Sequence, residues 1–89
     1  MSKAELTDIE TLSRFITNLK AFNAELDART QRLNSHWGSL QRVWRDRQCE
    51  KFAADWEASL TVIRKYLDGS SAYVSHLEKK RGQAETYGR

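Results

Sequence analysis

Residues 40–57 read LQRVWRDRQCEKFAADWE, a stretch in which aromatic residues flank a sudden cluster of charges. Such a stretch marks a functional site, a turn between two helices, or the middle of one long helix. The residues on its two sides decide between these, because apolar residues recur in steps of three and four before it and again after it. We therefore interpret the charged cluster as the turn of a helical hairpin.

The residues before this turn carry an apolar series of the kind that forms a helix-packing seam. At its start, Thr7 and Glu10 match a capping box and Asp8 adds a favourable charge to the first turn, while residues 2–5 contain a second such box. We predict a first helix over about residues 7–44. Its seam consists of Ile9, Leu12, Ile16, Leu19, Asn23, Leu26, Thr30, Leu33, Trp37, Leu40 and Trp44.

The residues after the turn carry a second series in the same steps, which predicts a second helix over about residues 46–81. Asp46 is a suitable N-cap, and KKRG at 79–82 offers cations and a glycine at the far end. Residues 82–89 are then a flexible tail. The alternative is that DGSS at 68–71 ends this helix early. The seam consists of Cys49, Ala53, Trp56, Leu60, Ile63, Leu67, Ser70, Val74 and Leu77.

Folding the chain between residues 46 and 47, with a turn over about residues 44–47, brings the two seams together in an antiparallel hairpin. The main polar break of the first seam, Asn23, then lies opposite Ser70 in the second. Two unrelated helices have no reason to place polar residues at one level, so the match favours a hairpin over a single rod. Leu12 opposite Arg81 is an imperfect pair and suggests fraying at the open end. We predict an all-α fold with one helical-hairpin domain over 1–89.

Composition limits the classes of function. The 89 residues include no proline and four glycines, and 15 basic residues against 12 acidic ones give a net charge of +3. No apolar run is long enough for a membrane span, and the acidic N-terminus is unlike a cleavable Sec signal. We expect a protein that is either secreted without such a signal or cytoplasmic.

Catalytic chemistry finds no support in the sequence. The single Cys49 lies too far along the hairpin from His36 to form a thiol–imidazole pair, and no His or carboxylate cluster has metal-ligand spacing. Trp37, Trp44 and Trp56 fall on the seam or at the turn, which favours core packing over a ligand site. We expect no enzyme activity, no cofactor and no metal.

A second aromatic series runs beside the seams. Phe15 and Phe22 are seven residues apart on the first helix, and Tyr66 and Tyr73 are seven apart on the second. Two helices alone leave such residues without a covering layer, and exposed apolar patches commonly mark interfaces. We predict pairing into a four-helix bundle, as a homodimer or as a heterodimer with a similar short helical protein. The alternative is that these residues widen the contact within the hairpin.

Basic residues gather at the hairpin tip, which raises a second hypothesis. A cytoplasmic helical module could bind nucleic acid or a protein through this tip, although the aromatic residues that would stack on bases lie along the seam instead. The alternative, which we favour over a phosphate-binding site, is that these residues form an ordinary solvated tip and do not bind nucleic acid. The residues concerned are Arg42, Arg45, Arg47 and Lys51.

The layout of the chain resembles the Trp-X-Gly (WXG) family, the small ESAT-like helical hairpins of bacterial type VII secretion. Trp44-Arg45-Asp46 occupies the place of the family motif between the helices. Phe52 stands six residues after Asp46, where the family has an aromatic residue, and Trp56 follows. The resemblance implies a non-enzymatic secreted protein or partner chain that acts through helix-face contacts, in touch with secretion machinery.

Two features depart from the family pattern. Asp46 replaces the motif glycine, so an N-cap must make the turn in place of glycine's conformational freedom. The C-terminal Tyr-x-x-x-Asp/Glu export signal is missing, since the fourth residue after Tyr66 is Ser70 and the fourth after Tyr73 is Leu77. If the protein is exported, we expect the signal to lie on a partner chain.

Overall fold

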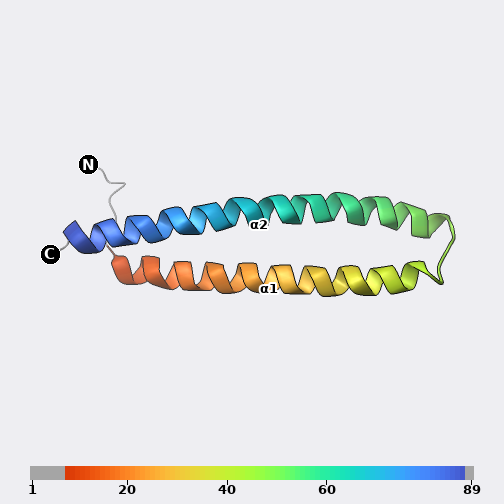
Figure 1. Cartoon of the computed structure of the whole chain (residues 1–89), viewed down its shortest axis with the longest axis horizontal. Coiled ribbons are helices and arrows are strands. Elements are labelled where there is room, and N and C mark those ends of the chain that lie inside the picture. Colours follow the sequence, from red (N-terminus) through yellow and green to blue (C-terminus); the bar gives the residue numbers. More distant parts are fainter. Residues whose placement is uncertain (1–7, 88–89) are drawn as a thin grey trace.

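The computed structural model of the chain describes residues 8–87, which form two long antiparallel helices (Figure 1). Helix α1 spans Ile9–Gln41 and helix α2 spans Arg47–Tyr87, and a short turn connects them at one end of the molecule. The hairpin measures 63 × 22 × 15 Å. The all-helical hairpin predicted from the apolar periodicity is confirmed for the described residues, which contain no strand.

The core of the hairpin is the predicted seam. Every buried residue in the described part of the chain belongs to it. The densest packing lies in the open half, where Leu12, Ile16 and Val74 form a cluster with Leu19 and Leu77 against it. The buried residues are Leu12, Ile16, Trp37, Cys49, Leu60, Ser70 and Val74.

The register of the two helices follows the predicted polar match. The Nδ2 group of Asn23 donates to Ser70 Oγ at 2.7 Å, and Tyr66 OH donates to Asn23 Oδ1 at 2.9 Å. A buried polar group costs little when it is hydrogen-bonded and much when it is not. This small network therefore favours the observed alignment over one shifted by a helical turn.

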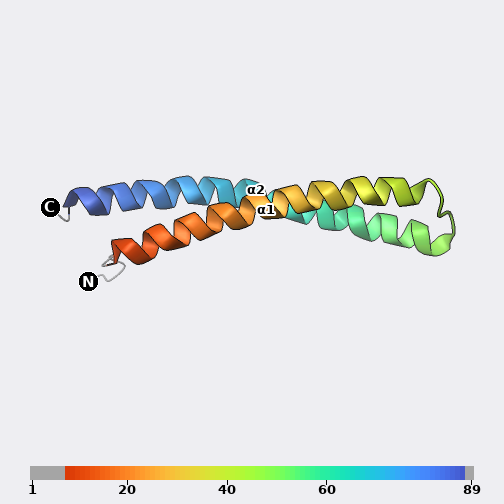
Figure 2. The ribbon, with the colours of Figure 1, turned by 90° about the horizontal axis from the view of Figure 1, so that it is seen from below.

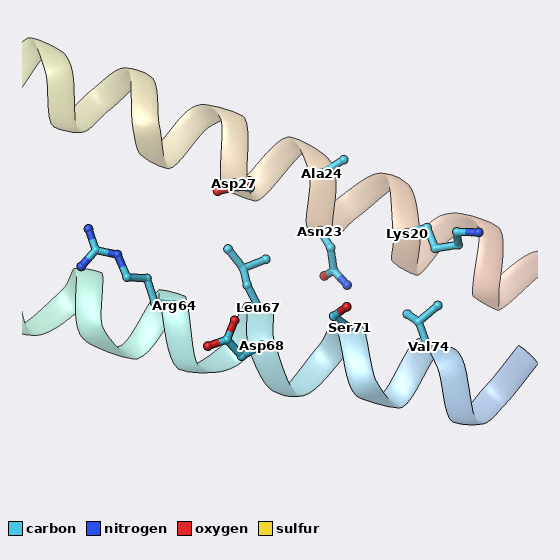
Figure 3. Close-up of a pocket in the computed structure, with 9 residues that line it drawn as sticks. All are labelled: Lys20, Asn23, Ala24, Asp27, Arg64, Leu67, Asp68, Ser71 and Val74. Carbon is cyan, nitrogen blue, oxygen red and sulfur yellow. The ribbon is translucent and has the colours of Figure 1, made fainter.

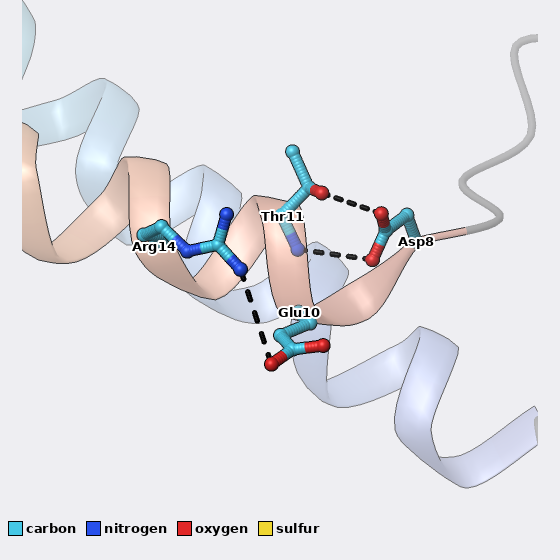
Figure 4. Close-up of polar contacts among 4 residues, drawn as sticks. All are labelled: Asp8, Glu10, Thr11 and Arg14. Carbon is cyan, nitrogen blue, oxygen red and sulfur yellow. Dashed lines mark hydrogen bonds and ion pairs between the residues drawn. The ribbon is translucent and has the colours of Figure 1, made fainter.

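Helix α1 begins at Ile9, two residues later than the predicted start at about residue 7. Asp8, with φ −129° and ψ 91°, is its N-cap, and the predicted cap Thr7 lies outside the described residues. The Asp8 carboxylate accepts from the Thr11 backbone N–H at 3.0 Å and from the Thr11 hydroxyl (Figure 4). Glu10 pairs with Arg14 at 3.9 Å. The Asp8 carboxylate therefore caps the helix, and it also places a negative charge near the helix N-terminus.

The end of α1 was predicted too far along the chain. The helix ends at Gln41, not Trp44, and residues 42–46 form the turn. The turn, predicted at about residues 44–47, therefore begins two residues earlier and contains five residues, a common length for the connection of two antiparallel helices. The Asp46 side chain accepts from the Cys49 N–H at 3.0 Å, which confirms the predicted N-cap.

The end of α2 was predicted too early. The helix continues to Tyr87 through Gly82, so the predicted flexible tail is wrong for residues 82–87, and residues 88–89 lie outside the described part. The seam extends with it, because the half-buried Ala84 lies level with the half-buried Ile9 of α1. Gly69 is also helical, so the predicted alternative of a break at 68–71 is wrong.

Two seam residues near the tip are less buried than predicted. Leu33 is 53% exposed and Leu40 is 46% exposed. A straight helix has 3.6 residues per turn, so a 3.5-residue seam drifts by about 20° per heptad. Figure 2 shows the two helices crossing. The drift turns these two leucines away from the seam and onto one side of the hairpin.

Candidate functional site

One long side of the hairpin carries exposed apolar side chains, and we call it the aromatic face. Phe15, Phe22 and His36 fall in one series of sevens on α1, and Phe52, Tyr66 and Tyr73 fall in another on α2. Residues seven apart lie on the same side of a helix. The face consists of Phe15, Phe22, Leu33, His36, Leu40, Phe52, Tyr66 and Tyr73, all of them exposed.

At the open end, the aromatic face contains a shallow groove of about 420 Å³. Phe15 lines it from α1, and Tyr66, Gly69 and Tyr73 line it from α2. Phe22 packs edge-on against Tyr66, with ring centroids 6.2 Å apart. The four aromatic residues singled out from the sequence therefore lie on one side of the hairpin.

Near the tip, the same face contains a smaller apolar groove of about 210 Å³. Trp37 packs edge-on against Phe52 at 4.7 Å between ring centroids, and Phe52 stacks with Trp56 at 6.4 Å. Phe52 therefore contacts both Trp37 and Trp56, which lie at one level when the chain is folded between residues 46 and 47. The groove is lined by Leu33, His36, Trp37, Leu40, Phe52 and Trp56.

The sequence analysis missed this tip half of the face. Phe52 was noted only as a motif aromatic, although it lies 14 residues before Tyr66 and so belongs to the same heptad column. That spacing was a usable signal. The exposure of Leu33 and Leu40 could not be predicted from spacing alone. It depends on how far the line of seam residues rotates around the helix before it reaches the tip.

The opposite side of the hairpin is polar. A groove of about 590 Å³ there is lined by charged side chains from both helices, among them Lys20, Asp27, Arg64 and Asp68 (Figure 3). Lys20 Nζ forms an ion pair with Glu78 across the helices at 3.0 Å. Charged groups such as these are well solvated and gain little from exposed pairing. The hairpin is therefore amphipathic, with the aromatic face on one long side and charged residues on the other.

Within the Trp44-Arg45-Asp46 motif, Trp44 packs on the core at the turn, while Arg45 and Asp46 are exposed. Trp44 is half-buried and packs edge-on against Trp37, with ring centroids 6.2 Å apart. Hydrogen bonds from the Trp44 side chain and from the Cys49 backbone N–H hold the pKa of the Asp46 carboxyl below its usual value. No described residue has a positive φ, so the turn needs no glycine.

The basic residues of the tip are all exposed. Within the part of the chain that the structure describes, none of the four forms an ion pair. Val43 beside them is 80% exposed, the highest value for a large apolar residue among the described ones. The tip is thus open to solvent. The residues are Arg42, Arg45, Arg47 and Lys51.

Over residues 8–87, no three His, Cys, Asp or Glu side chains come together as metal ligands. Neither described helix is long and apolar enough to cross a membrane. Comparison of the chain with protein-family models, with curated proteins and with solved structures gave no match. The amphipathic hairpin and its aromatic face are therefore the features from which a function must be argued.

Proposed function

We propose that this chain is a non-enzymatic interaction module whose aromatic face packs against a second helical hairpin to form a four-helix bundle. The partner is another copy or a similar short helical protein. One observation supports this above all: the exposed aromatic residues of both helices lie on a single side, opposite a polar one. Removing an apolar face of this kind from water is favourable. In a four-helix bundle, the second hairpin covers that face.

The surface area of the chain supports the same proposal. A compact monomer of its 10.4 kDa mass would expose about 5,400 Å². The chain exposes 7030 Å². The excess of about 1,600 Å² is roughly twice the area of about 800 Å² that each partner buries in an interface of standard size, so it matches the larger interfaces of obligate dimers. Two helices alone leave too much surface for a self-sufficient small domain.

For the biological role, we propose a WXG-like secreted protein or partner chain of a type VII-like secretion system. Its support is the resemblance in Trp44-Arg45-Asp46, Phe52 and Trp56, together with a hairpin whose turn holds that motif. Because neither Tyr66 nor Tyr73 is followed by Asp or Glu at the fourth position, export is proposed to depend on the paired chain. The aromatic face would then be a requirement for export as well as for assembly.

The proposal is tested with a Phe15→Glu, Phe22→Glu variant. Burying two unpaired carboxylates would cost several kcal/mol. The variant is expected to keep its helicity in circular dichroism but lose its partner in light scattering after size exclusion. In the producing cell, it is expected to stay inside while the parent protein reaches the medium.

A matched control is Thr17→Glu, Ala24→Glu. These residues are exposed, are also seven apart on α1, and introduce the same charge away from the aromatic face. The control should associate and be exported as the parent is. Association of the Phe15→Glu, Phe22→Glu variant at parental strength would place the interface elsewhere. A parent protein never found outside the cell would remove the secretory role but not the pairing.

A second candidate function is supported by the exposed, unpaired cations of the tip, which could hold a phosphate-rich partner. Binding of this kind weakens steeply with salt, because it releases condensed counterions. Replacing the four tip cations with Ala would abolish salt-sensitive binding to a short DNA or RNA duplex. Replacing Arg32, Arg64, Lys65 and Lys79 with Ala is the charge-matched control, and equal losses in both variants would count against a tip site.

A further inference from the structure

We infer that pairing through the aromatic face is regulated by pH, because protonation of His36 releases the partner. This regulation rests on the pairing proposed above and adds to it the range of pH in which the pair is stable. His36 is one of the two histidines of the chain. An imidazole changes its charge between about pH 5 and 8, whereas the side chains of Asp, Glu, Lys and Arg ordinarily keep theirs over that range.

His36 lies in the part of the hairpin that a partner covers. It falls in the same series of sevens as Phe15 and Phe22, so it lies on the same side of α1 as these two rings. In the single hairpin His36 is exposed, and water solvates both of its protonation states. A layer that packs along the whole aromatic face removes that water.

The surroundings of His36 on this face are apolar. The residue lines the groove of about 210 Å³ near the tip, and the other lining residues are all apolar or aromatic. Among the described residues that line this groove, none carries a carboxylate. The groove therefore suits a neutral imidazole and offers no counter-charge to a protonated one. The other lining residues are Leu33, Trp37, Leu40, Phe52 and Trp56.

Arg29 shows by contrast what a charge in this series of α1 requires. It stands seven residues before His36, and it pairs with Glu25, four residues before it, at 3.2 Å. The corresponding position before His36 holds Arg32, which is a cation. Like charges at this spacing repel each other, so a protonated His36 gains no partner there.

The charged residues of α2 near this level do not supply a partner either. Lys51 and Asp55 stand next to groove-lining residues in the sequence, but neither of them lines the groove. Glu57 is level with His36, but it falls in a series of sevens with Arg64, which lines the polar groove on the opposite side. Covering the face therefore favours the neutral imidazole, because burial of an unpaired charge is costly.

The direction of the pH dependence follows from this difference between the free and the paired chain. The free hairpin binds a proton at His36 more readily than the pair does, so pairing releases that proton. The Kd of the pair therefore rises as the pH falls below about 6.5, the ordinary pKa of an imidazole. Between about pH 7.5 and about pH 5.5, the expected rise is about tenfold for each His36 that pairing covers.

The test is the self-association of the purified chain at about pH 7.5 and about pH 5.5, at one ionic strength, measured by sedimentation over a range of concentrations. The parent is expected to show the tenfold or larger rise in Kd. His36→Gln keeps a polar side chain that does not titrate, and it should associate equally at both pH values. His76→Gln is the matched control and should respond as the parent does, because His76 stacks on Tyr73 at 6.0 Å but lines neither groove of the aromatic face.

A third variant, Arg32→Glu, tests the unpaired charge as the cause. It places a carboxylate four residues before His36, as Glu25 stands before Arg29, so the rise in Kd on acidification should be smaller than in the parent. A rise as large as the parent's would contradict this cause.

The outcomes separate the regulation from the pairing itself. Equal association of the parent at both pH values overturns the inference and leaves the proposed pairing intact. A pH response that survives in His36→Gln, or that disappears in His76→Gln, also overturns the inference. A chain that stays single at about pH 7.5 overturns both the inference and the self-pairing on which it rests.

Discussion

Asp46 shows how a single residue can replace the conformational freedom of glycine at a turn. The residue caps α2 through its bond to the Cys49 N–H, and its carboxylate also accepts a hydrogen bond from the Trp44 side chain. The turn is therefore held by specific hydrogen bonds, with no positive φ in the described residues. Its stability should depend on the charge of this carboxylate.

The pH dependence of unfolding tests this account of the turn. Hydrogen bonds lower the folded-state pKa of Asp46 and of Asp8 below the usual 3.8. The largest cause is the hydrogen bond from the Trp44 side chain for Asp46, and the hydrogen bond from the Thr11 side chain for Asp8. The unfolded carboxylates therefore bind protons first on acidification. The stabilisation is complete above the unfolded pKa and is lost as the pH falls through the folded pKa. Thermal melts should show the melting temperature falling below about pH 4.

The Asp46→Asn variant is the control for this prediction. Asparagine keeps a side-chain oxygen that can cap the helix, but it does not titrate. The melting temperature of the variant should fall less on acidification than that of the parent. An identical acid response in the two proteins would mean that other carboxylates carry the effect.

At the level of the helices, the sequence predicted the pairing better than the ends. The steps of three and four identify the contact face, because side chains three and four apart lie on one side of a helix. The match of Asn23 with Ser70 then fixed the register, and the bond between them confirms it. Helix ends depend on local competition between capping groups. The structure gives the capping role predicted for Thr7 to Asp8, and it places Gly82, which was predicted to stop the second helix, inside α2.

Only the open-end half of the aromatic face was predicted from the sequence. Phe15, Phe22, Tyr66 and Tyr73 were readable because they stand seven residues apart and outside the seam. The tip half of the face was not assembled from the sequence. Its groove requires Trp37, Phe52 and Trp56 to pack as one cluster, and the exposure of Leu33 and Leu40 arises from helical drift.

Replacement of Gly82 distinguishes a continuous α2 from one that ends at residue 81. In a helix interior with open space around it, Gly82→Ala should raise the free energy of unfolding by about 0.5–1 kcal/mol. If Gly82 instead ended the helix with a positive φ, its replacement by Ala would lower the free energy of unfolding. Urea denaturation measures the difference. Gly38→Ala is the matched control, since Gly38 is helical with nothing near its absent Cβ.

At the level of the whole molecule, the hairpin has the proportions of half a bundle. One long side is aromatic and the other is charged, and no third layer of this chain covers the aromatic side within residues 8–87. Stability should then come partly from a second chain. Any partner that binds only the folded state raises the apparent stability, and above its Kd the increase grows with the logarithm of its concentration.

The central claim, that the aromatic face is covered by a second chain, is tested most directly by thermal unfolding at protein concentrations that span about two orders of magnitude. For a self-pairing hairpin, mass action predicts a melting temperature that rises with concentration. The rise should disappear in Phe15→Glu, Phe22→Glu and persist in Thr17→Glu, Ala24→Glu. A cooperative transition at one temperature across the whole concentration range, with the mass of a single chain throughout, would contradict self-pairing through this face.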